Sequence, residues 1–301
     1  LYLPDPDGRL CFAEYGAPDG RPLLYFHGWP SSRLQARLLD RPAREQGFRM
    51  IAPDRPGLGR SSPRPGFSLP DWPALVGKLA DHLGLERFAA MGVSGGAPYA
   101  LACAHGLPER TVAASCVSSA PPLAEFPDRS ELMVPYRILL RLRPMAPLVF
   151  PVLLPFSRLV ARQDPGRPPL SWFLRWLSPV DRAAVASDPD NWRVLMESFH
   201  EATRQGGGPV VADADRYLED WEIDYSAISV PVDFWHGARD RNLPLSMIRE
   251  IAGRVPTARP HWLEDEGHYS LPLVHSAAIL RSLDDYFPND APVVQQRSSD
   301  G

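Results

Sequence analysis

Cysteine is scarce in this sequence of 301 residues. Its three cysteines, Cys11, Cys103 and Cys116, are too few and too widely spaced for a disulfide framework. None of them belongs to a C-x-x-C pair, which argues against a zinc ribbon or a dithiol redox site. We therefore expect reduced thiols packed in the interior and no structural metal.

A long apolar run is also missing. The longest apolar stretch, Met145–Phe156, is shorter than the roughly 20 residues that a membrane-spanning helix needs, and three prolines interrupt it. The start of the chain, Leu1–Phe12, has neither the basic region nor the apolar core of a secretory signal. We expect no membrane partner and a cytoplasmic location.

An excess of positive charge is the third absence. Against 36 acidic residues stand 32 basic ones, for a net charge of -4, and Lys78 is the single lysine. Such a chain has no overall cationic field with which to attract a nucleic acid, so we expect no nucleic-acid partner. With 44% hydrophobic residues, it has ample material for a core. The composition leaves a monomer and a homodimer equally open.

Short apolar segments alternate with segments of helical periodicity over most of the chain. This alternation is typical of βαβ units, and it predicts an α/β fold with a mostly parallel, twisted sheet and flanking helices. Gly47, Gly84 and Gly106 stand where helix C-caps are expected. The predicted strands are Pro22–His27, Phe48–Pro53, Phe88–Val93, Thr111–Ser118, Val230–His236 and Arg259–Leu263; the predicted helices are Leu34–Gln46, Trp72–Leu83, Gly96–His105, Leu245–Gly253 and Leu271–Tyr286.

The alternation stops at Pro121 and resumes after about Asp224. The stretch between is rich in proline, arginine, tryptophan and leucine and contains no convincing strand. We interpret residues 121–224 as a helical lid inserted into one α/β core formed by residues 1–120 and 225–301. The polar tail, 288–301, is predicted to fray.

One segment carries a specific chemical signal. Gly92-Val93-Ser94-Gly95-Gly96 has the pattern G-x-S-x-G, and it lies between a predicted strand and a predicted helix. In that context the pattern is typical of a nucleophile elbow, in which a sharp turn exposes the serine hydroxyl. By itself the pattern is also compatible with an ordinary glycine-rich turn.

A serine hydroxyl is a weak nucleophile at neutral pH and needs a histidine base and an orienting acid. His268 follows the last predicted strand, and Asp240 follows the strand before it, so both are expected at the carboxyl edge of the sheet near Ser94. The order Ser, Asp, His agrees with this architecture. Glu125 and Asp128 are the competing acids.

The negative charge of a tetrahedral intermediate also requires hydrogen-bond donors. The N–H of Gly95 directly follows the nucleophile at the start of a helix. The N–H of Trp29 lies in the turn His27-Gly28-Trp29-Pro30 after an early strand. We assign these two N–H groups as the oxyanion hole and expect the Trp29 side chain to line the pocket.

Together these segments resemble the α/β-hydrolase superfamily, in the lidded branch of proline-iminopeptidase-like enzymes, esterases and lactonases. The segment Pro53–Ser61 resembles that family's structural turn. Relatives that act as haloalkane dehalogenases or epoxide hydrolases use an aspartate nucleophile, whereas this chain has Ser94. Many relatives also carry a larger residue at the position of Gly95, which leads us to expect a more open pocket floor here.

The resemblance gives a second meaning to two lid carboxylates. Glu197 and Glu201 stand four residues apart and can share a helix face. In iminopeptidase relatives, lid carboxylates hold the amino group of the substrate; the alternative is that the pair forms a solvated face. Gly206-Gly207-Gly208 is interpreted as a hinge, and the lid tryptophans mainly as packing between the lid and the core.

The sequence thus predicts a cofactor-independent serine hydrolase that cleaves a small-to-medium carboxylic ester, lactone or thioester through an acyl-enzyme on Ser94. One alternative is an aminopeptidase similar to proline iminopeptidase. Another is a non-hydrolytic protein on the same scaffold, either a lyase or cyclase or a ligand receptor.

Overall fold

The core of the protein is an eight-stranded sheet with the strand order β1-β2-β4-β3-β5-β6-β7-β8. In this computed structural model, residues 1–160 and 167–287 are described. The strands β3 to β8 run parallel to one another. At one edge of the sheet, β1 and β2 pair in the antiparallel sense, and neither of them is among the predicted strands. The strands are β1 Tyr2–Leu3, β2 Leu10–Gly16, β3 Arg21–Phe26, β4 Phe48–Pro53, β5 Phe88–Val93, β6 Thr111–Val117, β7 Val232–Gly237 and β8 Ala258–Leu263.

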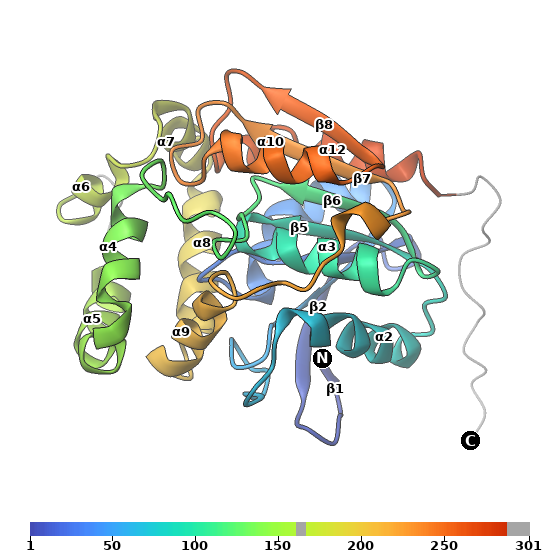
Figure 1. Ribbon diagram of the computed structural model, residues 1–301, viewed down its shortest axis with the longest axis horizontal. Coiled ribbons are helices and arrows are strands. Elements are labelled where there is room, and N and C mark those ends of the chain that lie inside the picture. Colours follow the sequence, from blue (N-terminus) through green and yellow to red (C-terminus); the bar gives the residue numbers. More distant parts are fainter. Residues whose placement is uncertain (161–166, 288–301) are drawn as a thin grey trace.

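Helices cover both faces of the sheet (Figure 1). Side chains of β3 alternate between the two faces, so Leu24 and Phe26 belong to one core cluster while Leu23 and Tyr25 belong to another. The first cluster also includes side chains from three helices, α2 Trp72–His82, α3 Ala97–Gly106 and α10 Leu245–Arg254. The second contains α1 Asp40–Glu45 and α12 Ser276–Asp284. The fold is therefore the three-layer α/β arrangement that the sequence predicts.

Two predicted helices are in fact divided. The segment predicted as Leu34–Gln46 is a 3-10 helix, η1 Arg33–Leu39, followed by α1. Pro42 lies in the first turn of α1, where a missing N–H is tolerated, so a helix continuous through Leu39 is disfavoured. The segment predicted as Leu271–Tyr286 is divided at His275 into α11 Ser270–Val274 and α12. His275 caps both helices with φ -102° and ψ 12°, outside the regular helical conformation.

Of the three predicted glycine caps, two follow a helix in the left-handed conformation. These are Gly47 after α1 and Gly84 after α2, with φ of 70° and 66°. Gly106 instead is the last residue of α3. The two correct predictions mark turns that only glycine adopts without strain.

Residues 121–224, which we call the helical insertion, connect β6 to the adjacent strand β7. Figure 1 shows its helices gathered at one end of the molecule, beside the sheet. They are α4 Val134–Leu142, α5 Ala146–Val160, α6 Leu170–Leu174, α7 Pro179–Ala186, α8 Pro189–Ala202 and α9 Gly207–Asp215. The predicted fraying tail, 288–301, lies outside the described residues.

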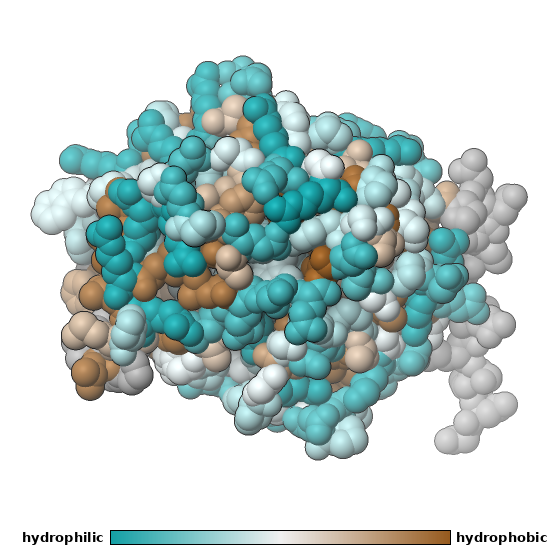
Figure 2. Space-filling view, viewed as in Figure 1, coloured by the Kyte–Doolittle hydropathy of each residue, from teal (hydrophilic) through white to brown (hydrophobic). Residues whose placement is uncertain are grey.

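The outer side of the helical insertion is unusually apolar. Figure 2 shows hydrophobic side chains gathered over α4 and α5, and these include Ile138, Leu142, Met145, Phe156 and Leu159. Trp172 and Trp176 are also exposed, whereas Trp221 is buried, so packing against the core accounts for only part of the tryptophan content. Among the described residues, no helix has the length and apolar character required to cross a membrane.

Candidate active site

Ser94 occupies a tight turn between β5 and α3. Its φ of 55° lies in the left-handed region that non-glycine residues rarely adopt. The glycines around it leave no room for a side chain: a Cβ at Gly92 would overlap the carbonyl oxygen of Gly96, and one at Gly96 would overlap that of Phe26. The close approach of these backbones explains why glycine is required there, and the turn holds Ser94 at the carboxyl edge of the sheet.

Ser94, His268 and Asp240 form a continuous hydrogen-bonded chain. His268 Nε2 lies 3.0 Å from Ser94 Oγ, and His268 Nδ1 lies 2.8 Å from Asp240 Oδ2. Because a carboxylate only accepts hydrogen bonds, Nδ1 carries the proton and Nε2 is free to accept from the serine hydroxyl. The three residues named from the sequence are thus brought together in the order that a nucleophile, base and orienting acid require.

Asp240 is held in one orientation by its own loop. Its Oδ1 accepts the N–H groups of Asn242 at 2.8 Å and Leu243 at 3.0 Å, and its side chain is fully buried. Burial raises the pKa of Asp240, but the attraction and hydrogen bond of His268, the neighbouring His236 and the N–H of Leu243 outweigh burial and keep that pKa below its ordinary value. Asp240 is therefore an anion that can stabilise a protonated His268.

The two competing acids lie elsewhere. Glu125 pairs with Arg254 and accepts from Tyr225, while Asp128 is exposed and accepts the N–H of Ser130. Neither contacts His268. Of the three acids named from the sequence, Asp240 is the one that contacts His268.

The loop that carries His268 is fixed from two sides. Asp181 of α7, which is completely buried, accepts the N–H groups of Tyr269 at 2.7 Å and Ser270 at 2.9 Å. Ser118, at the end of β6, donates its hydroxyl to the carbonyl oxygen of His268. Burial lowers the pKa of His268, but Asp240 and, more weakly, Asp181 overcome that effect and raise the pKa above its ordinary value.

The two predicted oxyanion donors flank the serine. Gly28, which precedes Trp29, packs close to the Ser94 side chain, and Gly95 follows Ser94 directly. Among the described residues, no acceptor is found for the N–H of Trp29 or of Gly95. Both donors are thus free to bind a ligand oxygen.

The expectation of an open pocket floor at Gly95 is wrong. A Cβ at this position would overlap the hydroxyl of Tyr217 and crowd Trp29. Tyr217 comes from the helical insertion and donates its hydroxyl to the carbonyl oxygen of Gly95 at 2.8 Å. The space that a larger residue fills in relatives is taken here by a distant tyrosine, which no local sequence pattern could reveal.

A mostly apolar pocket of about 120 Å³ opens beside Ser94. Trp29 lines it, as expected, and its indole N–H donates to the carbonyl oxygen of Val210 at 2.9 Å. At the far side, Arg143 and Asp215 form an ion pair. The remaining wall is leucine-rich and comes largely from the helical insertion: Leu123, Leu132, Leu139, Leu140, Leu218 and, from the core, Leu243.

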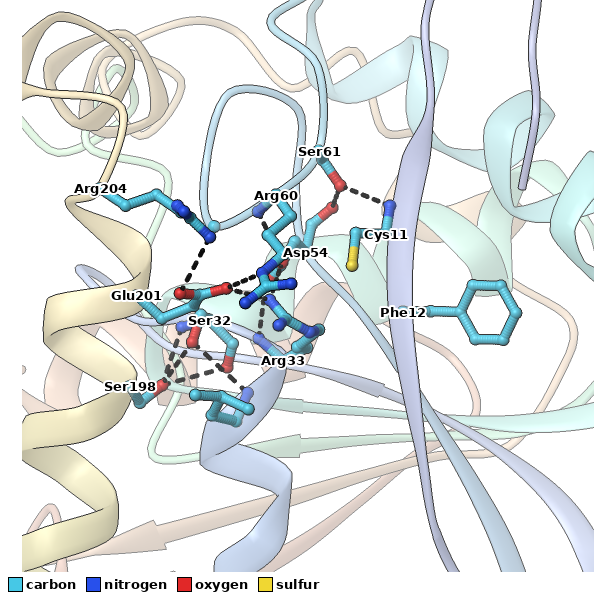
Figure 3. Close-up of polar contacts among 12 residues, drawn as sticks. Cys11, Phe12, Ser32, Arg33, Asp54, Arg60, Ser61, Ser198, Glu201 and Arg204 are labelled. Atoms are coloured by element: carbon cyan, nitrogen blue, oxygen red, sulfur yellow. Dashed lines mark hydrogen bonds and ion pairs between the residues drawn. The ribbon is translucent and has the colours of Figure 1, made fainter. Parts of the chain in front are cut away.

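Glu197 and Glu201 do not line this pocket. Figure 3 shows Glu201 of α8 meeting Arg33 and Arg60 of the core, with Arg204 on its other side. Glu197 pairs with Arg37 and Arg193. These carboxylates join the helical insertion to the core, so neither a bound substrate amino group nor a simply solvated face describes them.

Other groups around the site have no specific signal in the sequence. Arg55 lies in the segment that resembles the family's structural turn. Asp181, Asp213 and Tyr217 come from the helical insertion, whose sequence gives no periodic or spacing signal for a site. Within the described part of the chain, no three His, Cys, Asp or Glu side chains gather as potential metal ligands.

Comparison with known proteins identifies the family to which this fold belongs. Residues 21–273 match the model of the alpha/beta hydrolase fold family. A non-heme chloroperoxidase of Streptomyces lividans is 27% identical over 241 residues, which cover 78% of this chain and 80% of that protein. An esterase from Exiguobacterium antarcticum has a similar structure, with a TM-score of 0.68 at 16% identity, over 95% of this chain and 98% of that one.

A shorter match is closer in identity. Haloalkane dehalogenase 2 of Mycobacterium tuberculosis is 35% identical over 100 residues, or 32% of this chain. The match spans 34% of the dehalogenase, about a third of its length. Since the family match covers most of the chain, the protein belongs to the alpha/beta hydrolase fold family.

Proposed function

We propose that this protein is a serine hydrolase that cleaves a small-to-medium carboxylic ester, lactone or thioester through an acyl-enzyme on Ser94. The observation that carries the proposal is the hydrogen-bonded chain from Ser94 through His268 to the buried Asp240, at the edge of an apolar pocket. The helical insertion, which forms much of that pocket, acts as the lid.

In the acylation half-reaction, Ser94 Oγ attacks the carbonyl carbon while His268 Nε2 takes the hydroxyl proton. The resulting imidazolium is stabilised by Asp240, and the oxyanion accepts the N–H groups of Trp29 and Gly95. When the tetrahedral intermediate collapses, His268 gives its proton to the departing alkoxide or thiolate, and the acyl group remains on Ser94.

Deacylation repeats these roles with water. His268 takes a proton from the water that attacks the acyl-enzyme, and the same two N–H groups hold the second oxyanion. His268 then returns the proton to Ser94 Oγ as the carboxylic acid leaves. The proton transfers between Ser94 Oγ and His268 Nε2 join two atoms that lie 3.0 Å apart in the structure.

The pocket supports an uncharged acyl group of modest size. A cavity of about 120 Å³ is comparable with the engineered apolar cavity of about 150 Å³ that binds benzene. Leucine side chains offer no partner for a charged group, because burying an unpaired charge is costly. We therefore expect short acyl chains to be preferred.

The same pocket argues against an aminopeptidase. A substrate ammonium needs a free carboxylate, whereas Glu197 and Glu201 are paired with arginines outside the pocket and Asp215 is paired with Arg143. We expect aryl acyl esters to be hydrolysed and amino-acid anilides, including proline anilide, to be left intact.

The test combines active-site labelling with turnover. A fluorophosphonate probe is expected to form an adduct that mass mapping places on Ser94. Rates on 4-nitrophenyl esters of increasing acyl length are expected to fall beyond the short chains. Ser94→Ala is expected to abolish labelling and to reduce turnover by roughly 10⁴-fold or more. A matched control is Ser119→Ala, which removes a nearby buried hydroxyl that is not part of the hydrogen-bonded chain.

Each outcome has a clear meaning. Failure of the folded protein to label on Ser94 would defeat the acyl-enzyme mechanism. Rates that rise steadily toward long acyl chains would contradict the assignment of the pocket. If labelling occurs but the natural activity survives Ser94→Ala, the lyase or cyclase alternative is favoured instead.

A further inference from the structure

Resting on the proposed function, we propose that Arg55 and Asp213 are a positioning pair that fixes the oxyanion hole from below. Arg55 follows β4 in the core, whereas Asp213 belongs to α9 of the helical insertion. Neither residue touches the pocket, so any effect on the reaction must pass through the backbone that they hold.

The pair is the most deeply buried pair of an arginine and a carboxylate among the described residues. Side-chain exposure is 1% for Arg55 and 0% for Asp213, and Arg55 donates from both Nε and Nη2 to the carboxylate, with the shortest contact 2.7 Å. Tyr99 and Arg216 also donate to Asp213 Oδ1, at 3.1 and 2.9 Å. The guanidinium is therefore fixed in one plane, which a bidentate partner achieves and a point charge does not.

The other side of that guanidinium is bonded to the oxyanion loop. Arg55 Nη2 donates to the carbonyl oxygen of Gly28 at 3.0 Å, and Nη1 donates to the carbonyl oxygen of His27. The carbonyl of Gly28 and the N–H of Trp29 belong to the same planar trans peptide, so they point in opposite directions. A donor that holds the carbonyl on one side fixes the direction of the N–H on the other.

His27 adds to the same orientation. Its Nε2 accepts the N–H of Arg55 at 3.3 Å, which leaves Nδ1 to donate to the carbonyl oxygen of Gly28 at 2.9 Å. Burial and the neighbouring Arg55 charge hold the pKa of His27 well below its ordinary value, so the ring stays neutral in this tautomer. Two donors thus converge on one carbonyl oxygen.

The residue that supplies the second donor is also bonded to this cluster. Tyr217, which lies 3.4 Å from Arg55 Nη2, donates its hydroxyl to the carbonyl oxygen of Gly95. The cluster thus holds the peptide that carries the Trp29 N–H directly, and it holds the Gly95 N–H through the carbonyl of Gly95 in the next peptide. Since Asp213 and Tyr217 come from the helical insertion, the geometry assigns the insertion a share in building the oxyanion hole, beyond covering the pocket.

The main test removes both charges at once. In Arg55→Met/Asp213→Leu, apolar side chains of similar size replace the pair, an exchange that buried ion pairs often tolerate. Arg216, which loses its bond to Asp213, keeps its bond to the carbonyl oxygen of Phe67. We expect a folded protein whose KM for 4-nitrophenyl acetate is unchanged and whose kcat falls by about 10- to 100-fold. An alkylboronic acid, which forms a tetrahedral adduct with Ser94, should bind more weakly by the same factor.

Arg55→Lys is the second variant and guards against a double variant that does not fold. Lysine keeps the charge opposite Asp213 but cannot donate to Asp213 and to the Gly28 carbonyl in the same plane, so the same loss in kcat is expected. The matched control is Arg37→Gln/Glu197→Gln, which removes another ion pair between core and insertion that contacts neither donor peptide. Its kinetics should equal those of the wild type.

A crystal structure of the double variant separates this inference from the proposed function. We expect the Gly28–Trp29 peptide to rotate or to lose its single orientation. An unchanged peptide, or a kcat within about twofold of wild type in folded variants, overturns the inference. If the wild-type protein neither labels on Ser94 nor hydrolyses esters, the proposed function fails. The orientation of the Gly28–Trp29 peptide in the variant then still shows whether Arg55 positions that peptide.

Discussion

Asp181 acts on the imidazole of His268 without contacting the ring. Its carboxylate accepts two N–H groups of the residues that follow His268, and its charge helps to raise the pKa of that histidine. One buried side chain thus has two separable effects, one on the position of the loop and one on the proton affinity of the base.

Asp181→Asn separates these effects, because asparagine keeps an acceptor oxygen and loses the charge. His268 must be neutral to accept the serine proton, so activity falls as the pH drops through its pKa. Removing a negative charge lowers that pKa, and the acidic limb of the kcat/KM profile should move to lower pH. The profile of ester hydrolysis against pH measures this directly.

Asp188→Asn is the matched control for this prediction. Asp188 belongs to the same insertion, and its exposed carboxylate caps α8. Asparagine removes the charge and caps a helix equally well. Its acidic limb should coincide with that of the wild type. A limb that stays in place in Asp181→Asn, or moves to higher pH, contradicts the electrostatic role.

Residues differ in how far the sequence could reveal them. Ser94, Asp240 and His268 each follow a strand of a parallel sheet, and the carboxyl ends of such strands meet at one edge, so their proximity could be predicted. Asp181 and Asp213 reach the same region from helices whose packing angles no spacing encodes. The contact between Tyr217 and Gly95 is of this second kind. The sequence therefore does not reveal that the pocket floor beside Gly95 is closed.

The helices α3 and α4 differ strongly in how many of their residues are buried. Eight of the ten residues of α3 are buried, whereas α4 has no buried residue and exposes Ile138 and Leu142. Burial of apolar surface is the main source of local stability. The outer helices of the insertion are therefore held more weakly than the helix that supports Ser94.

Hydrogen–deuterium exchange should resolve this difference. We expect the amides of α4 to exchange through local openings that cost little free energy, while those of α3 exchange only near the global unfolding free energy. Peptide-level mass spectrometry after a series of labelling times is the measurement. Equal protection in the two helices would show that a partner or packing not visible here covers α4.

The predicted elements illustrate what periodicity can and cannot give. The strands of the parallel sheet were located to within about two residues because each is a short apolar run with a turn signal after it. The break between η1 and α1 is absent from the predicted elements because apolar periodicity does not register the effect of Pro42. The antiparallel strands β1 and β2 are absent because they form an edge with no helix between its strands.

For the molecule as a whole, the three thiols report on the integrity of the core. Cys11, Cys103 and Cys116 are all free and buried, on β2, α3 and β6. Burial raises the pKa of each thiol above its ordinary value, which leaves little reactive thiolate. Their scarcity in the sequence makes them a simple set of probes.

We expect no reaction of the native protein with Ellman's reagent and reaction of all three thiols in concentrated guanidinium chloride. The absorbance of the released thionitrobenzoate counts them, and the rate at intermediate denaturant should follow unfolding measured by circular dichroism. A thiol that reacts at once in the native protein would contradict the burial of its strand or helix.

The buried acids of the helical insertion have a consequence for modularity. The chain enters and leaves the insertion between adjacent strands, so the insertion could be exchanged for another by recombination. Yet a foreign insertion without an acid in place of Asp213 would leave the Arg55 cation unpaired in the core, and one without Asp181 would release the loop after His268. Insertion and core must therefore be inherited, or engineered, as a matched pair.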